Sequence, residues 1–236
     1  MKKRIWELDA FRGVCVLGMV LVHLTYDLTV LYQVVNWVTP AWFTFVQTWG
    51  GVLFLLISGI SVTLGRHSVK RGLIVLGSGM LITAATVGMY LLQMANRGII
   101  IYFGVLQCLG ICMILWPLFK KLPWQALTLI GSAMVIFGMW LAKQPPVDSY
   151  LLMPFGLPWP TFYTSDYFPL FPNLGFFLLG ATLGRTLYRN KETLLPQVNE
   201  KAAVLVFLQK CGKYSLFIYL LHQPILSGLC MLLSML

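Results

Sequence analysis

The sequence predicts an all-α fold, a polytopic bundle of about seven transmembrane helices, because the chain is strongly apolar and its apolar runs have membrane-spanning length. Of its 236 residues, 58% are hydrophobic and only 10% are charged, and the mean hydropathy is +0.81. A soluble domain carries roughly 25% charged residues. Since one crossing needs roughly 20 apolar residues, the length leaves no room for a soluble second domain, and we interpret residues 1–236 as a single transmembrane domain.

Seven apolar segments of suitable length follow one another along the chain. The expected helices cover residues 10–32, 42–64, 72–94, 99–118, 124–142, 171–188 and 213–234. Two other segments are not simple spans. Residues 143–170 form a long loop rich in proline and aromatic residues, too apolar for disorder, which we expect to fold onto the outer face or to dip into the bundle. Residues 198–210 predict a short helix with one apolar face, lying along the cytoplasmic interface.

The distribution of lysine and arginine predicts the orientation of the bundle. Thirteen basic residues precede the first expected helix or lie in the loops after the second, fourth and sixth, whereas the alternate loops hold two. Basic loops stay in the cytoplasm, so the N-terminus should be cytoplasmic and the C-terminus outside. Because the net charge of +10 gathers in these loops, it predicts contact with a lipid bilayer and not with nucleic acid. We expect a multi-pass protein of the cell (plasma or inner) membrane.

The first expected helix carries most of the ionisable residues inside the spans. Arg12 and His23 lie eleven residues apart, about three helical turns, and Asp27 follows His23 by four residues, so the three share one face. Asp9 lies three residues before Arg12 and is expected to form an ion pair with it. Ionisable groups inside a membrane are costly and usually functional. A histidine with a carboxylate one turn away suits general-base catalysis, with Asp27 orienting His23.

Four further polar residues stand inside or beside the other expected spans. His222 and Gln223 precede Pro224 in the last helix, where the proline kinks the helix. Gln107 is an uncharged polar residue in mid-helix, and Asp166 lies just outside the sixth helix. Each of these positions is also compatible with a packing or capping role. Arg66 and Arg71, in a cytoplasmic loop, serve topology or attract an anionic cytosolic ligand.

The cysteines and histidines predict neither a disulfide framework nor a metal site. The five cysteines lie in or beside apolar runs, and none lies in the long outer loop. We see no metal-ligand spacing, and we expect no metal. A small proton-coupled transporter or permease is the alternative function, because arginine, histidine and aspartate on one helix also suit a proton relay. The absence of an inverted sequence repeat argues against it.

Four segments carry a resemblance to a known family. They read "ELDAFRGVCVLGMVLVHLTYDL", "YFGVLQCLGI", "DYFPLFPNLGFFLLGATLGR" and "GKYSLFIYLLHQPIL". Together they resemble membrane-embedded acyltransferases, above all the bacterial relatives of heparan-α-glucosaminide N-acetyltransferase (catalytic domain). The pattern L-D-x-x-R-G, followed by a helix and a histidine, is also similar to that of bacterial sugar O-acyltransferases. Members of the first group often carry a histidine where this chain has Gln107.

The resemblance implies transfer of an acetyl or other acyl group from cytosolic acyl-CoA, across the membrane, to a sugar or similar acceptor at the outer face. The donor would be acetyl-CoA or another acyl-CoA. The expected site residues divide into three groups. They are His23, Asp27 and His222 for catalysis, Arg12, Arg66 and Arg71 for the acyl donor, and Gln107, Asp166 and Gln223 for the substrate.

Overall fold

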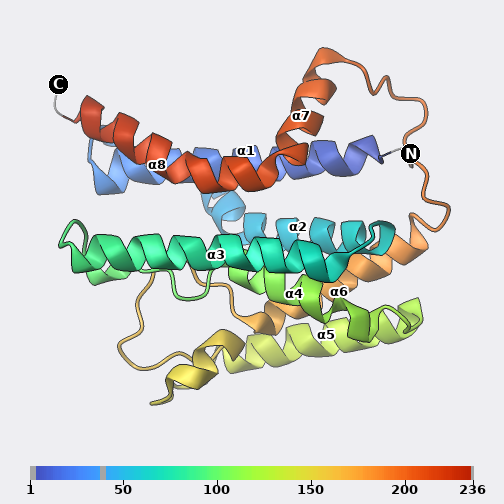
Figure 1. The fold of residues 1–236 in the computed structure, drawn as a ribbon, viewed down its shortest axis with the longest axis horizontal. Helices are drawn as coiled ribbons and strands as arrows, with labels where there is room; N and C mark the ends of the chain where they lie inside the picture. Colours follow the sequence, from blue (N-terminus) through green and yellow to red (C-terminus); the bar gives the residue numbers. More distant parts are fainter. Residues whose placement is uncertain (1–3, 38–40, 235–236) are drawn as a thin grey trace. The chain divides into compact units, whose positions relative to one another are not determined.

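The computed structural model describes residues 4–37 and 41–234, and these residues form α-helices joined by turns and short 3-10 segments (Figure 1). The α-helices are α1 Trp6–Tyr26, α2 Ala41–Leu64, α3 Ser68–Leu91, α4 Val105–Phe119, α5 Trp124–Leu141, α6 Leu170–Thr186, α7 Ala203–Lys213 and α8 Ser215–Leu233. The described residues divide into two compact units. One comprises residues up to 57 together with those from 190 onward, and the other comprises residues 58–189.

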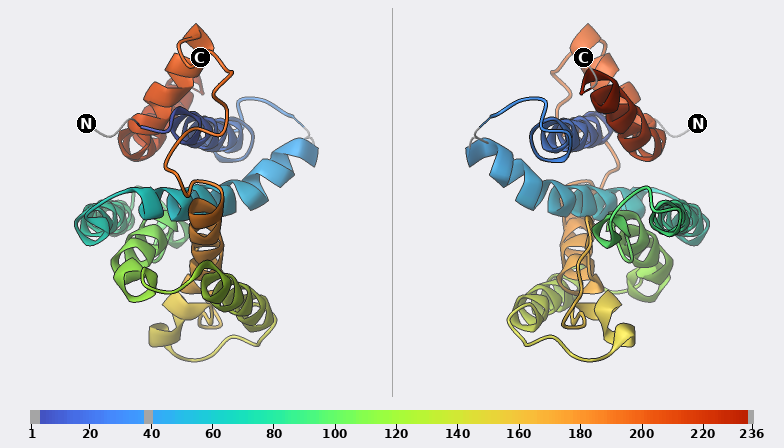
Figure 2. Two further views of the ribbon diagram at one scale, coloured as in Figure 1. Left: turned by 90° about the vertical axis from the view of Figure 1, so that its right-hand side faces the viewer. Right: turned by 90° about the vertical axis from the view of Figure 1, so that its left-hand side faces the viewer.

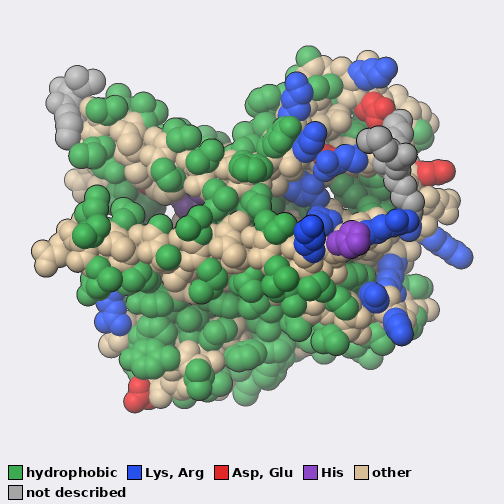
Figure 3. Space-filling model, in the orientation of Figure 1, with side chains coloured by type: hydrophobic (Ala, Val, Ile, Leu, Met, Phe, Trp, Pro, Cys, Tyr) green, Lys and Arg blue, Asp and Glu red, His purple; other side chains and the backbone are tan. Residues whose placement is uncertain are grey.

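The apolar helices confirm a multi-pass membrane protein with an all-helical fold. Five helices are long and apolar enough to cross a membrane, namely Trp6–Leu31, Phe43–Leu64, Ser68–Leu91, Trp124–Leu141 and Ser215–Leu233. The other two expected spans, α4 with 15 residues and α6 with 17, are shorter. Hydrophobic side chains cover much of the visible surface (Figure 3), as a surface facing lipid requires. The count of seven crossings and the orientation stay predictions.

Several expected boundaries differ from the structure, among them the start of the third helix, which lies at Ser68 and not at residue 72. The first helix begins at Trp6, four residues earlier than expected, and its last turn, Asp27–Leu31, is π-helical. The fourth begins at Val105 and not at residue 99, because the preceding residues are extended and the carbonyl of Phe103 accepts a hydrogen bond from the N–H of Phe168 at 2.9 Å. The expected amphipathic helix is present as α7 but lies a few residues later.

The first unit contains two helices that run side by side and a third that crosses them. α1 and α8 run side by side in the same direction, with α8 beginning part-way along α1, and α7 rises steeply from α1 (Figures 1 and 2). Two glycines allow this crossing. A Cβ atom on Gly13 would overlap the Leu208 carbonyl oxygen, and one on Gly212 would overlap the Asp9 carbonyl oxygen. The backbones of α1 and α7 therefore touch, and α7 is fixed across the first turns of α1.

In the second unit, α3 packs on α4, α5 packs on α6, and the expected outer loop packs on the segment before α4. The hydroxyl of Thr164 donates to the Ile100 carbonyl at 2.6 Å, and that of Ser165 donates to the Gly98 carbonyl at 2.7 Å. The Tyr167 hydroxyl donates to the Met153 carbonyl at 2.6 Å, and burial raises the pKa of this phenol. The loop is thus an ordered part of this unit.

Candidate functional site: a polar centre between α1 and α8

Two pairs of polar side chains, each spaced four residues apart, face each other across α1 and α8. His23 and Asp27 come from α1 and its π-helical end, and Gln223 and Ser227 come from α8. Side chains four residues apart lie on one helix face, so parallel neighbouring helices bring the two pairs together. His222 joins them, with its ring centroid 4.8 Å from that of His23 in an edge-to-face arrangement.

Asp27 is fully buried and its carboxylate receives its hydrogen bonds from α8. Nε2 of Gln223 donates to Oδ1 at 3.1 Å and to Oδ2 at 3.0 Å, and the Ser227 hydroxyl lies 3.4 Å from Oδ2. The sequence predicted that Asp27 would orient His23. In the structure, this carboxylate accepts hydrogen bonds from Gln223 and Ser227, because α8 places an amide donor and a hydroxyl donor opposite it.

The main chain changes its winding at this position. Residues Asp27–Leu31 form a π-helix, in which the N–H of Tyr32 donates to the Asp27 carbonyl at 2.9 Å. π-helical turns are rare in proteins, and this one ends the helix. The wider turn starts at the residue whose side chain bonds to α8, so the local geometry of α1 and the position of this carboxylate are linked.

The hydrogen bond of His222 determines which of its ring nitrogens carries the proton. Nδ1 lies 2.6 Å from the backbone carbonyl oxygen of Tyr219. A carbonyl only accepts, so Nδ1 is the protonated nitrogen in the neutral ring, and Nε2 presents its lone pair. Nε2 is buried and has no hydrogen-bond partner among the described residues.

Gln223 presents a second acceptor of the same kind. Its Nε2 must face the Asp27 carboxylate, because only the nitrogen of the amide can donate to it. Oε1 therefore points away from Asp27, and it too is buried without a partner among the described residues. Buried polar atoms are nearly always hydrogen-bonded in native proteins. Two adjacent residues of α8 thus offer acceptor atoms that fit an N–H or O–H donor from a ligand.

The start of α1 carries the ion pair that the sequence predicted. Nη1 of Arg12 lies 2.9 Å from Oδ1 of Asp9, and Nε of Arg4 lies 2.8 Å from Oδ2. Asp9 is buried, and the side chain of Arg12 is only 14% exposed. At about 1.5 Å per residue, Arg12 lies roughly 16 Å along α1 from His23. The two charged regions of α1 are therefore separate.

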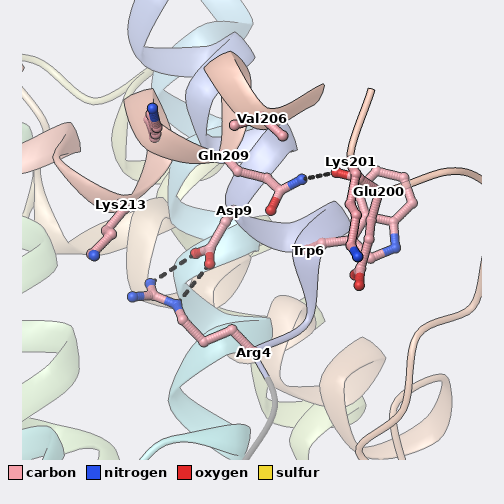
Figure 4. Close-up of a pocket in the computed structure, with 9 residues that line it drawn as sticks. Arg4, Trp6, Asp9, Glu200, Lys201, Val206, Gln209 and Lys213 are labelled. Atoms are coloured by element: carbon pink, nitrogen blue, oxygen red, sulfur yellow. Dashed lines mark hydrogen bonds and ion pairs between the residues drawn. The ribbon is translucent and has the colours of Figure 1, made fainter. Parts of the chain in front are cut away.

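A cavity of about 390 Å³ opens beside this ion pair, between the start of α1 and α7 (Figure 4). Its lining carries four cations and two carboxylates together with apolar and amide groups. The lining residues are Arg4, Trp6, Asp9, Glu200, Lys201, Val206, Gln209, Lys210 and Lys213. The sequence does not predict this cavity, because the segments that form it are about 190 residues apart.

Gln107 and Asp166 lie in the other unit, both at the start of α4. Nε2 of Gln107 donates to the Gly79 carbonyl at 2.9 Å and to the Thr83 hydroxyl at 2.8 Å, and Oε1 accepts from the N–H of Gly104 at 3.0 Å. Oδ2 of Asp166 accepts from the first backbone N–H of α4 at 3.2 Å. These bonds cap α4 and join it to α3. The role of both residues in substrate binding stays a prediction.

Arg66 and Arg71 are exposed, at the turn between α2 and α3 and in the first turn of α3. They belong to the second unit, whereas Arg12 belongs to the first. Their expected role in donor binding stays a prediction. No group of three histidine, cysteine or acidic side chains that could hold a metal occurs in the part of the chain that the structure describes.

Two contributors to the centre were not expected from the sequence. Ser227 follows Gln223 by four residues, so the helical spacing of α8 was a usable signal. The carbonyl of Tyr219 had no such signal, since any residue has a backbone carbonyl and only the rotamer of His222 selects this one.

The fold and this centre define a polytopic membrane protein with a buried polar site formed by two of its apolar helices. The family model described as "Heparan-alpha-glucosaminide N-acetyltransferase, catalytic" matches residues 4–224. The chain therefore belongs to this family of membrane acetyltransferases, as its sequence motifs predicted, and a transporter is not favoured. No curated protein and no solved structure matched the chain.

Proposed function

We propose that this protein transfers an acetyl or other acyl group from cytosolic acyl-CoA to an amine of a sugar-like acceptor at the outer face of the membrane. The observation that carries the proposal is the pair of buried, unpartnered acceptor atoms, Nε2 of His222 and Oε1 of Gln223, inside a chain of an acetyltransferase family.

The acceptor group is proposed to be a primary amine because of the number of hydrogens it offers. Two acceptor atoms on adjacent residues require two donor hydrogens if both are to be satisfied. A neutral primary amine carries two N–H hydrogens, and a hydroxyl carries one. A site that leaves a buried acceptor unpaired loses about 1–3 kcal/mol of binding. A primary amine can therefore satisfy both acceptors, whereas a single hydroxyl satisfies one, and for this reason we propose N-transfer.

His222 is the better prepared of the two histidines to act as the base. Its Nδ1–H is held by the Tyr219 carbonyl, so the ring is oriented and its Nε2 lone pair is available. As the acceptor nitrogen attacks the thioester carbonyl carbon, the C–S bond breaks, the amine proton passes to Nε2, and the released CoA thiolate takes up a proton. His23, whose ring edge lies against His222, completes the centre from α1.

The acyl donor is proposed to meet Arg12 through its phosphates. The guanidinium of Arg12 matches phosphate geometry, and Asp9 keeps it in place through the ion pair at 2.9 Å. Acyl-CoA carries its thioester at the end of a long flexible arm. Phosphates at the level of Arg12 are therefore compatible with a thioester near His23, further along the same helix.

The test is transfer of label from radiolabelled acetyl-CoA to matched acceptors, glucosamine and glucose, by the purified protein in lipid nanodiscs. We expect label to be transferred to glucosamine and little label to be transferred to glucose. His222→Asn should lower the rate by about 10²–10⁴-fold, because asparagine keeps a donor toward Tyr219 but has no basic nitrogen. Label in neither acceptor, or equal label in both, contradicts the proposal of amine transfer.

The chain offers a matched control for this substitution. His67 is exposed and lies at φ 59°, a left-handed conformation that asparagine tolerates. His67→Asn should therefore fold and transfer label at the wild-type rate. If the His222→Asn and His67→Asn variants have the same rate, His222 is not the base.

A further inference from the structure

The cavity beside α7 has properties that the proposed acyl transfer does not use. Among the described residues, the ion pairs recorded at this end join Arg4 and Arg12 to Asp9, and no carboxylate lies within salt-bridge distance of Lys201, Lys210 or Lys213. Three lysines that share one cavity repel one another and attract an anion. Figure 3 shows lysine and arginine side chains gathered around α7 and the start of α1.

The helix that carries two of these lysines also has an apolar flank. Val204 and Phe207, three residues apart, are 70% and 56% exposed. The flank against α1 contains Leu208 and Gly212, so the exposed pair is not the surface that docks on the protein. Lys210 and Lys213 lie on another side of the helix and line the cavity. A basic face and a separate exposed apolar flank are typical of a helix that lies in a membrane interface.

The crossing of α7 and α1 agrees with such a position. α1 is long and apolar enough to span the membrane, and α7 crosses it steeply at its first turns (Figure 1). A helix that crosses a spanning helix in this way lies close to the membrane plane. Trp6, an aromatic residue of the kind enriched at membrane interfaces, lines the same cavity.

We propose that this cavity binds the phosphate headgroup of an anionic phospholipid, with Lys201, Lys210 and Lys213 around the phosphate and Val204 and Phe207 among the acyl chains. A soluble phosphate compound would use the lysines but would leave the apolar flank unexplained. Clusters of basic residues on an amphipathic helix beside a spanning helix are the usual recognition pattern for anionic lipids. This inference does not depend on the proposed acyl transfer.

The test measures lipid retained by the full-length protein in neutral detergent, by native mass spectrometry, with phosphatidylglycerol and phosphatidylcholine offered together. The wild type should retain phosphatidylglycerol in preference. Each lysine is worth roughly fivefold in lipid affinity, so Lys210→Gln with Lys213→Gln should lower this preference on the order of twenty-fivefold. The matched control is Lys120→Gln with Lys121→Gln, two exposed lysines between α4 and α5, which should retain the wild-type preference.

Two further measurements, one on Lys201 and one with soluble phosphates, test the lipid assignment independently of the double variant. Lys201→Gln lies in the turn before α7 and leaves the helix unchanged, so it should lower the preference about fivefold even if the double variant does not fold. Coenzyme A and inorganic phosphate, added in excess, should not release the lipid. Unchanged lipid preference in the cavity variants, or release of the lipid by either soluble phosphate, overturns the assignment.

Discussion

Exchanging the groups that join α1 to α8 tests whether Asp27 positions Gln223. In Asp27→Asn, one carboxylate oxygen becomes an NH2 group, which faces the donating Nε2 of Gln223. Nε2 of Gln223 can still donate to the remaining side-chain oxygen at position 27, but it then also faces the new NH2 group, and turning Gln223 over relieves this donor–donor contact and points its Nε2 where Oε1 had been. The site then presents an N–H donor to the amine of the substrate, which itself needs to donate its hydrogens.

The magnitudes follow from the bonds that are exchanged. Hydrogen bonds to a charged group contribute about 1.5–3 kcal/mol each, and neutral ones about 0.5–1.5 kcal/mol. Replacing the two hydrogen bonds to the charged carboxylate by bonds between neutral amides should lower the free energy of unfolding by about 1–3 kcal/mol. Losing the acceptor atom at Oε1 should lower kcat/KM for the amine by roughly tenfold to a hundredfold, mainly through KM. The affinity for the acyl donor should not change.

The reversed pair supplies the decisive comparison. Asp27→Asn combined with Gln223→Glu places the amide on α1 and the carboxylate on α8, so the same two groups meet with their roles exchanged. Thermal unfolding in detergent should show a coupling energy of about 0.5–3 kcal/mol between the two positions, and the acceptor KM should recover in part. The stability measurement needs no activity, so it tests the contact even if the proposed reaction is wrong.

One outcome would refute this reasoning. If Gln223→Glu gives no rescue, and the effect of Asp27→Asn disappears only in a His23→Asn background, then Asp27 acts through His23, as the sequence predicted.

Three other predictions concern the donor side, the docking of α7 and the topology. Arg12→Gln should weaken binding of acyl-CoA in a filter-binding assay, and Arg12→Lys should restore it only in part because lysine lacks the planar fork; equal donor affinity in all three proteins would leave Arg12 only as the partner of Asp9. Gly212→Ala should destabilise the protein by about 1–3 kcal/mol in thermal unfolding, because its Cβ overlaps the Asp9 carbonyl, whereas Gly228→Ala, with open space around its Cβ, should not. A reporter enzyme fused to the C-terminus should be active outside the cytoplasm, and strong cytoplasmic activity would contradict seven crossings.

The features that depend on solvent and on local spacing could be predicted from the sequence. A membrane interior demands long apolar segments, so composition predicted the class of fold and the approximate position of each helix. Spacing along one helix predicted the Asp9–Arg12 ion pair, which the structure confirms at 2.9 Å. The family motifs lie in consecutive segments, and for this reason they predicted the acetyltransferase family that the comparison confirms.

Which of these side chains meet depends on how the helices pack. Asp27 and Gln223 are 196 residues apart in the chain, and their contact exists because α1 and α8 run side by side. Helical spacing fixes distances within one helix but says nothing about the neighbour that packs against it. For the same reason the sequence assigned Asp27 to His23, its nearest ionisable neighbour on α1, and could not anticipate the hydrogen bonds that Asp27 accepts from α8 or the backbone carbonyl that orients His222.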